Sequence, residues 1–162
     1  MSHLADPADT KALLDVLQEV KDPEIPELSI VELGMVNRVS VGESGVRVEL
    51  TPTFVGCPAL DLIAEQVEKV LTRERGDPVE VDFVMNPPWT SERITPEGRK
   101  KLKDFGIAPP PGTRNESGDI VADCPFCGAG EGEILNLFGP TACRSIFYCR
   151  NCRQPFEGMK PV

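Results

Sequence analysis

Two pairs of cysteines near the C-terminus constrain the fold of this chain more than any other feature. Cys124 and Cys127 form one C-x-x-C unit, Cys149 and Cys152 form a second, and 21 residues separate the two units. Two thiolates at this spacing can bind one ion while the chain between them turns tightly, and two such units supply a tetrahedral set of sulfur ligands. The pattern predicts a structural zinc site in a module of residues 120–158, which has few large apolar side chains and needs such a cross-link to fold.

The sequence alone leaves the chemistry of this site open. Four thiolates also bind a single iron ion, and an iron–sulfur cluster could form there if Cys143 or Cys57 took part. The cysteines could instead be buried or redox-active thiols that hold no metal. We expect zinc, and we expect Cys143 to pack beside the site rather than to bind the ion.

Charge and cysteine usage limit the classes of function. The chain has 162 residues and a net charge of −9, and residues 1–86 alone carry 7 Lys and Arg against 17 Asp and Glu. Such an acidic surface repels phosphate backbones, so we expect no nucleic-acid partner. The sequence has no apolar run of about 18 residues that would span a membrane. Six cysteines without an export signal favour a reducing compartment, so we expect a cytoplasmic protein.

The apolar pattern of residues 8–86 predicts a small α/β domain. A helix with one apolar face comes first, followed by an alternating hairpin over residues 35–50, a second helix that Pro58 opens and a third strand from Val79. We interpret residues 22–26, which contain two prolines, as a loop. The order of elements is α-β-β-α-β, and the fold class is α+β with a C-terminal zinc-ribbon-like module.

Residues 87–119 have the composition of a linker that contains one short helix. Thr95 can cap this helix, Pro96 suits its first position, and Gly106 can end it. Prolines and polar residues follow as far as Asp119 and are typical of a semi-rigid spacer. We therefore predict three segments, which are the α/β domain, this linker and the metal-binding module.

Cys57 is the candidate reactive thiol of the first domain. It directly precedes the predicted helix at Pro58, and the free N–H groups and the dipole at a helix N-terminus stabilise a thiolate. Cys57 is therefore a candidate nucleophile or cluster ligand, although a small buried residue at a tight turn is an equally good interpretation. Asp22 and Glu24 are candidate acid–base groups, but a carboxylate in a proline-bracketed loop is more often a turn or cap residue. We expect no catalytic cysteine–histidine pair, because the single histidine is His3.

Three stretches of the first half carry a family resemblance, namely Asp22-Pro23-Glu24-Ile25-Pro26, Ser29-Ile30-Val31-Glu32-Leu33-Gly34-Met35-Val36 and Thr51-Pro52-Thr53-Phe54-Val55-Gly56-Cys57-Pro58. They resemble the family of iron–sulfur cluster assembly factors related to SufT. Members of that family are small α/β domains, and the family motif includes a reactive cysteine at the position of Cys57.

Further segments of the chain make the resemblance more specific. They are Pro87-Pro88-Trp89-Thr90, Ile94-Thr95-Pro96-Glu97-Gly98, Gly106-Ile107-Ala108-Pro109-Pro110, Phe138-Gly139-Pro140-Thr141-Ala142-Cys143, and Pro155-Phe156 after the closing cysteine pair. These segments are similar to the PaaD family of accessory subunits of phenylacetyl-CoA epoxidase systems. The likeness covers roughly residues 10–157, and the combination of modules is specific.

The resemblance implies a role in bacterial phenylacetate degradation. The partners it implies are other epoxidase subunits, either the di-iron oxygenase or the reductase, which carries flavin and an iron–sulfur cluster. It implies an accessory protein that helps to mature these centres and does not turn over substrate itself, with structural Zn²⁺ in the ribbon and transient iron or an iron–sulfur cluster at Cys57. The alternative is a purely structural subunit of the oxygenase complex; a thiol enzyme and a nucleic-acid-binding ribbon are weaker alternatives, and a homodimer is compatible with the sequence.

Overall fold

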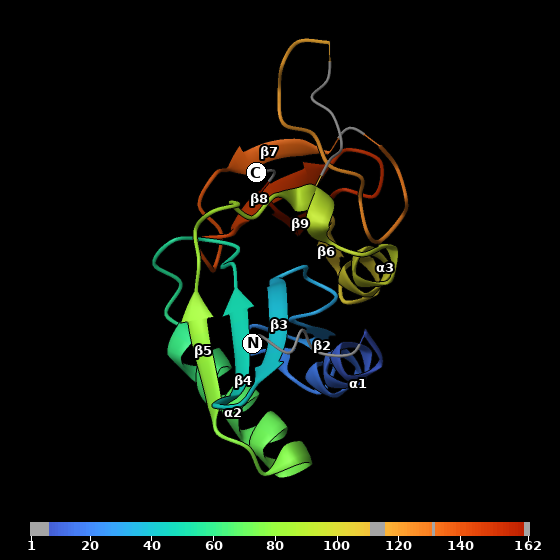
Figure 1. Ribbon diagram of the computed structural model, residues 1–162. Helices are drawn as coiled ribbons and strands as arrows, with labels where there is room; N and C mark the ends of the chain where they lie inside the picture. The colour runs from blue at the N-terminus through green and yellow to red at the C-terminus, as the bar shows by residue number, and fades with distance from the viewer. Residues whose placement is uncertain (1–6, 111–115, 131, 161–162) are drawn as a thin grey trace. The chain divides into compact units, whose positions relative to one another are not determined.

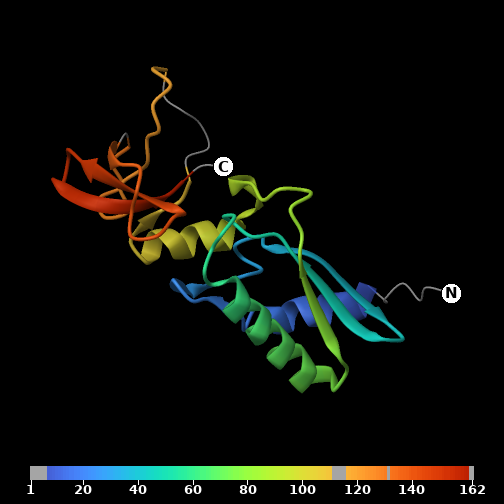
Figure 2. The same ribbon diagram turned by 90° about the vertical axis from the view of Figure 1, so that its left-hand side faces the viewer.

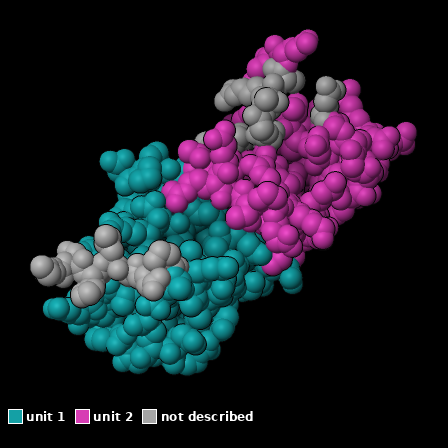
Figure 3. All heavy atoms as spheres, turned by 45° about the vertical axis from the view of Figure 1, so that its right-hand side comes forward, with its two compact units in different colours: residues 1–89 teal, residues 90–162 magenta. Residues whose placement is uncertain are grey.

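The structure is a computed structural model that describes residues 7–110, 116–130 and 132–160 (Figure 1). The chain divides into two compact units, residues 1–89 and residues 90–162, which are called unit 1 and unit 2 below (Figure 3). Helices and several small sheets occur together, which confirms the α+β class. None of the helices in the described part of the chain is long and apolar enough to cross a membrane.

Unit 1 contains a three-stranded sheet, a two-stranded sheet and two helices. In chain order its described elements are α1 (Pro7–Leu17), β1 (Lys21–Asp22), β2 (Ile25–Ser29), β3 (Val36–Gly42), β4 (Gly45–Leu50), α2 (Leu60–Arg75) and β5 (Val79–Phe83). β3 and β4 form an antiparallel hairpin, and β5 lies parallel to β4, so the sheet order is β3-β4-β5. α1 contacts β3, α2 contacts β5 and the helices contact each other, so both cover the same face of the sheet (Figure 2).

The core of unit 1 follows from the periodicity of its sequence. The predicted apolar stripe of α2 is buried, and Gly76 ends this helix in the left-handed conformation with a φ of 73°. Alternate residues of β4 face the same interior. The fully buried side chains of this core include Leu17, Leu28, Ile30, Leu33, Met35, Val48, Leu50, Ile63, Val67 and Leu71.

The segment 22–26, which the sequence suggests is a loop, instead belongs to a short hairpin, so that interpretation was wrong. β1 and β2 pair in antiparallel fashion. The Asp22 carboxylate accepts hydrogen bonds from the backbone N–H groups of Glu24 (2.8 Å) and Ile25 (3.0 Å), which closes a tight turn between the strands. A two-stranded hairpin leaves strand edges free, so Pro26 is tolerated in β2 despite its missing N–H.

Unit 2 is built on a four-stranded sheet. Its described elements are a short 3₁₀ helix (Ser91–Arg93), α3 (Pro96–Asp104), β6 (Ile107–Ala108), β7 (Glu133–Asn136), β8 (Arg144–Cys149) and β9 (Gln154–Met159). The strand order is β6-β9-β8-β7, in which β6 is parallel to β9 and the other neighbours are antiparallel. Residues 90–108, part of the predicted linker, therefore lie within this unit and supply a strand to its sheet.

The predicted short helix of this region is confirmed as α3. It begins at Pro96, and the Thr95 hydroxyl oxygen accepts a hydrogen bond from the Gly98 backbone N–H at 3.0 Å, as expected for an N-cap. The chain leaves the helix through Gly106, whose φ is 89°. Of the predicted spacer that follows, residues 111–115 lie outside the described residues.

The core of unit 2 is small, as its composition predicts. Its buried members are Ala108, Ala122, Cys124, Phe147, Cys149 and Phe156. Phe147 and Phe156 supply the large side chains, and their rings stack with centroids 5.5 Å apart. Two of the six core residues are cysteines of the C-x-x-C units, so the packing of this core depends on the state of the thiols.

Candidate metal centre and thiol loop

The structure brings Cys124, Cys127, Cys149 and Cys152 together in unit 2. One sulfur atom from each lies within 4.8 Å of the other three. The Sγ atoms of Cys124 and Cys152 are 3.7 Å apart, and those of Cys127 and Cys149 are 3.6 Å apart. A tetrahedral zinc ion with zinc–sulfur bonds of about 2.3 Å holds its sulfur ligands about 3.8 Å apart, so the spacing of these thiols fits such an ion.

Local backbone turns explain how each C-x-x-C unit presents two sulfurs on one side. In the first unit the Gly128 backbone N–H donates to the Cys124 carbonyl at 2.9 Å, and the Cys124 N–H donates to the Ala129 carbonyl at 2.8 Å. Gly128 has a φ of 74°, a conformation that suits glycine. The second unit closes β8 into β9, which also places Cys149 in the buried core.

The pKa values of Cys127 and Cys152 are shifted in opposite directions. The Asn151 side-chain amide, and next the Ala129 backbone N–H, lower the pKa of Cys127 to about 6 by hydrogen bonding to its sulfur. Burial, and next hydrogen bonding with the thiol of Cys149, raise the pKa of Cys152 to about 12. A bound divalent cation removes the cost of ionising Cys152, because a thiol that coordinates such an ion is deprotonated. The donor set therefore suits a cation that accepts several thiolates at once.

Cys143 lies outside the four-cysteine set. Its sulfur is half-buried and lies 3.3 Å from the Thr141 hydroxyl oxygen, and its carbonyl accepts a hydrogen bond from the Lys160 backbone N–H at 2.9 Å. Cys143 is therefore available as a comparison thiol from the same unit.

Cys57 lies on a loop of unit 1 between β4 and α2. Its backbone N–H donates to the Phe54 carbonyl at 3.3 Å, which makes residues 54–57 a turn, and Gly56 occupies this turn with a φ of 85°. The thiol is half-buried, while Phe54 and Val55 in the same turn are exposed. The loop is thus a tight turn in which a half-buried cysteine adjoins two exposed apolar residues.

The helix after Cys57 begins later than the sequence predicts. α2 starts at Leu60 rather than at Pro58, and Ala59, with helical backbone angles, makes no side-chain cap. The Leu60 N–H donates to the Cys57 carbonyl at 3.4 Å, so a further turn separates the thiol from the helix. A direct effect of the helix dipole on Cys57 is correspondingly weaker, because this effect falls off within the first turn.

Asp22 holds the turn of the β1–β2 hairpin through the two backbone hydrogen bonds described above. This is the structural role that the sequence offers as the alternative to acid–base chemistry. An acid–base role for Asp22 or Glu24 stays a prediction.

Two local features of the structure were missed by sequence reasoning. Asn151, inside the second C-x-x-C unit, donates its side-chain amide to the Cys127 sulfur at 3.5 Å. In unit 1, Ser29 and Glu32 form a reciprocal pair: the Glu32 N–H donates to the Ser29 hydroxyl at 3.0 Å, and the Ser29 N–H donates to the Glu32 carboxylate at 2.9 Å. Their S-x-x-E spacing is a signal that could have predicted this pairing.

Comparison with known protein families matches each unit separately. Residues 10–83 match the model of the iron–sulfur cluster assembly protein family. Residues 108–160 match the PaaD zinc beta ribbon domain. The first unit is also similar to solved structures: a crystal structure of a domain of unknown function DUF59 from Bacillus anthracis has a TM-score of 0.55 and 35% identity, and covers 59% of this chain and 92% of that one.

The chain is also similar in sequence to two named proteins. A protein of Escherichia coli (strain K12), named as a candidate component of 1,2-phenylacetyl-CoA epoxidase, is 34% identical over 148 residues, which covers 91% of this chain and 90% of the relative. The Fe-S protein maturation auxiliary factor SufT of Staphylococcus aureus (strain USA300) is 42% identical over 79 residues, which covers 47% of this chain and 88% of the relative.

Fold, cysteine cluster and relatives together define an iron–sulfur-assembly-type α/β domain joined to a metal-binding β ribbon. The chain belongs to the PaaD family of phenylacetyl-CoA epoxidase components. The family resemblance seen in the sequence is thereby confirmed.

Proposed function

We propose that this chain is an accessory subunit of a 1,2-phenylacetyl-CoA epoxidase system and assists the assembly of iron or iron–sulfur centres in its partner subunits. The observation that carries the proposal is the combination of a maturation-factor domain, which presents a half-buried cysteine on a tight turn, with the PaaD-type ribbon. The chain itself turns over no substrate of the epoxidase.

Cys57 is the residue to which we assign the assembly role. Cys57 is half-buried beside the exposed Phe54 and Val55, where a partner surface can cover it. A thiolate is a soft ligand that accepts iron or an iron–sulfur cluster. In this proposal the metal is cargo that Cys57 holds transiently and passes to the partner.

The four-cysteine cluster has a different role in the proposal. It holds Zn²⁺ as a structural ion, because all four tetrahedral positions are filled by protein sulfur and none is left open for a substrate. The ion connects the first C-x-x-C unit, which follows Ala122, to the β8–β9 hairpin. It thereby stabilises the small core of unit 2. Iron in the same four-sulfur site would stabilise the core of unit 2 in the same way.

The location and partners follow from charge and thiol chemistry. Reduced cysteines that bind metal persist in a reducing compartment, so we place the protein in the cytoplasm. The acidic residues 1–86 favour a basic protein surface and oppose nucleic acid. The reductase with its iron–sulfur cluster and the di-iron oxygenase are the two candidate clients.

Anaerobic purification of the protein with and without the epoxidase reductase tests the proposal. Metal content, acid-labile sulfide and binding are measured on the same samples. Iron or sulfide that appears on the chain, depends on Cys57 and moves to the partner supports assembly. Iron that never associates with the wild-type chain, in the presence of an iron-replete partner, contradicts it.

A purely structural subunit is the second candidate function. The observation that favours it is the metal-linked ribbon, a module whose fold suits stable partner contact. A structural subunit would bind the oxygenase with the same affinity whether residue 57 is Cys or Ser. It would also leave the iron content of every partner unchanged.

A further inference from the structure

The exposed apolar side chains of unit 1 gather at one end of its sheet. Every large apolar side chain that is exposed in the described part of unit 1 belongs to this group, which is called the apolar patch and consists of Phe54, Val55, Leu62 and Met85. Their exposed fractions lie between 41% and 72%. Apolar residues scattered singly over a surface are ordinary, but a group of them at one place marks an interaction site.

The topology of the sheet explains this grouping. β4 and β5 are parallel neighbours, so both strands end at the same edge, where Figure 1 shows their two arrowheads side by side. Phe54 and Val55 lie in the loop that leaves β4, and Met85 follows the end of β5 by two residues. Leu62 lies in the first turn of α2, to which the same loop leads. Loops that a rigid sheet positions in this way frequently carry binding residues.

The apolar patch includes the turn that carries Cys57. The Cys57 backbone N–H donates to the Phe54 carbonyl at 3.3 Å, and the Leu60 N–H donates to the Cys57 carbonyl at 3.4 Å. Along the chain, the half-buried cysteine therefore lies between the two exposed residues of its turn and the exposed Leu62. A protein that covers both parts of the patch also covers Cys57.

Negative charge accompanies the apolar patch. Residues 51–68 contain Asp61, Glu65 and Glu68 and no Lys or Arg. All three carboxylates are exposed, and none of them forms an ion pair with another described residue, Lys69 on the next turn of α2 included. The helix dipole accounts for Asp61 in the first turn of α2, but this effect falls off before Glu65 and Glu68. Leu62 and Glu65 are three residues apart and so lie on the same side of the helix.

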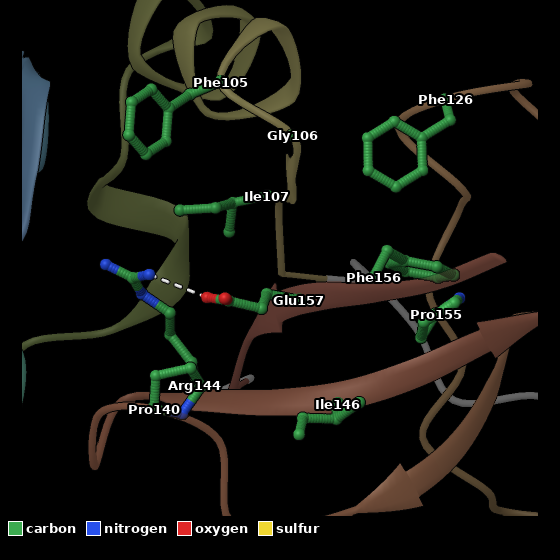
Figure 4. A pocket seen from close by; sticks show the side chains of 10 residues that line it. All are labelled: Phe105, Gly106, Ile107, Phe126, Pro140, Arg144, Ile146, Pro155, Phe156 and Glu157. Atoms are coloured by element: carbon green, nitrogen blue, oxygen red, sulfur yellow. Dashed lines mark hydrogen bonds and ion pairs between the residues drawn. The ribbon is translucent and has the colours of Figure 1, made fainter.

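The exposed apolar surface of unit 2 differs from this patch in its charge. It includes a cleft of about 360 Å³ bordered by Phe105 and Phe126. The carboxylate in this cleft, Glu157, already accepts a hydrogen bond from the Arg144 guanidinium at 2.7 Å, as Figure 4 shows. Residues 87–162 as a whole carry 10 Lys and Arg against 9 Asp and Glu. The cleft of unit 2 therefore gives no indication of a charged partner, whereas the apolar patch of unit 1 does.

We propose that the apolar patch is the surface on which this chain docks its client protein, and that the client presents an apolar side chain flanked by Lys or Arg. The proposal rests on the assembly role proposed above and specifies the contact with the client. The apolar side chain of the client covers the patch beside Cys57, and its basic groups lie near Asp61 and Glu65.

Charge complementarity favours this occupant over a second copy of the chain. The patch borders unpaired carboxylates, and residues 1–86 carry 7 Lys and Arg against 17 Asp and Glu. A basic surface is attracted to such a site, and its approach is accelerated. Two copies that met through this patch would instead bring the same acidic residues together, which costs free energy.

Binding of the purified epoxidase reductase and, separately, of the di-iron oxygenase to the full-length, metal-loaded chain tests the proposal. Affinity and association rate are measured by surface plasmon resonance at low and at physiological salt. Leu62→Ala shortens an exposed leucine of the patch, and Leu137→Ala is the matched control, because Leu137 is similarly exposed (51% against 45%) but lies in unit 2. Glu65→Gln removes one charge beside the patch, and Glu74→Gln removes one near the other end of α2.

The expected result is that one partner binds the wild-type chain and binds Leu62→Ala about tenfold more weakly, while Leu137→Ala binds like the wild type. Glu65→Gln should weaken binding about two- to fivefold at low salt, mainly through slower association, and Glu74→Gln should not. Equal affinity of the wild type and Leu62→Ala, equal loss in Leu62→Ala and Leu137→Ala, or no binding of either partner would overturn the proposal. Binding that neither salt nor Glu65→Gln weakens would overturn the basic character of the client surface.

Iron transfer to the bound partner separates a failure of docking from a failure of the assembly role. Cys57→Ser should bind the partner as tightly as the wild type and deliver no iron. If Leu62→Ala bound like the wild type while Cys57→Ser delivered no iron, the docking proposal would fall and the assembly role would stand. If Cys57→Ser delivered iron normally, the assembly role of Cys57 would fall instead. Self-association of the wild-type chain that Leu62→Ala abolishes, measured by sedimentation, would overturn the docking proposal in favour of a second copy.

Discussion

The variant Cys124→Ser tests how far unit 2 depends on its metal. Cys124 is fully buried, its sulfur lies 3.7 Å from that of Cys152, and it belongs both to the cysteine cluster and to the core. Serine removes one of four thiolates and leaves a hard oxygen donor that binds zinc poorly. We therefore expect the variant to lose its metal and unit 2 to lose most of its stability.

The magnitude follows from the linkage between binding and folding. A ligand present at 100 to 1,000 times its dissociation constant stabilises the folded state by about 2.7 to 4.1 kcal/mol. For a domain of the size of unit 2, each kcal/mol corresponds to about 4–8 °C in Tm. Loss of the metal should therefore lower the melting temperature of unit 2 by roughly 10–30 °C. The buried serine hydroxyl adds a further cost of about 1–3 kcal/mol.

The assay combines metal analysis with calorimetry of the full-length chain. The wild type should carry about one zinc per chain, and a strong chelator should reproduce the lowered transition of the variant without any substitution. Cys143→Ser is the matched control, because Cys143 is half-buried in the same unit and lies outside the cluster. If Cys124→Ser kept its zinc and melted like the wild type, or if the chelator left the wild type unchanged, the reasoning would be refuted.

Three further predictions concern other parts of the chain. Cys57 should react with iodoacetamide near neutral pH faster than Cys143, as followed by mass spectrometry, and equal or slower modification would remove the case for a reactive thiol. Trp89→Phe should lower the free energy of unfolding of unit 1 by about 1–3 kcal/mol, because Trp89 is buried and its indole N–H donates to the Leu33 carbonyl at 2.8 Å; no change in chemical denaturation would contradict this. Limited proteolysis should cut first within residues 109–119 and leave the α/β domain folded, and first cuts elsewhere would contradict the spacer prediction.

The ribbon cysteines and α3 could be predicted because their signals are local. The spacing of the two C-x-x-C units encodes the cluster, and the pair of Thr95 and Pro96 encodes the start of α3. In the same way, the 3.6-residue periodicity of α2 predicted its buried face. In each case the residues that carry the signal also make the contact.

Other features could not be predicted because they depend on distant parts of the chain. β6 is a strand of two residues that pairs in parallel with β9, about 50 positions later, and no local pattern specifies such a partner. The β1–β2 hairpin was missed because Pro23 and Pro26 suggest a loop, while the Asp22 hydrogen bonds that close its turn appear only in three dimensions.

The iron content of the epoxidase partners in cells that carry Cys57→Ser tests the central claim most directly. Oxygenase and reductase are purified from these cells, from wild-type cells and from cells with Cys143→Ser, and their iron and acid-labile sulfide are measured per chain. The assembly role predicts that one partner is deficient in iron only in the Cys57→Ser cells, which then fail to grow on phenylacetate, while the variant chain itself keeps its fold and its zinc. Full iron content and full activity of both partners in the Cys57→Ser cells would contradict the account and leave Cys57 as a structural residue.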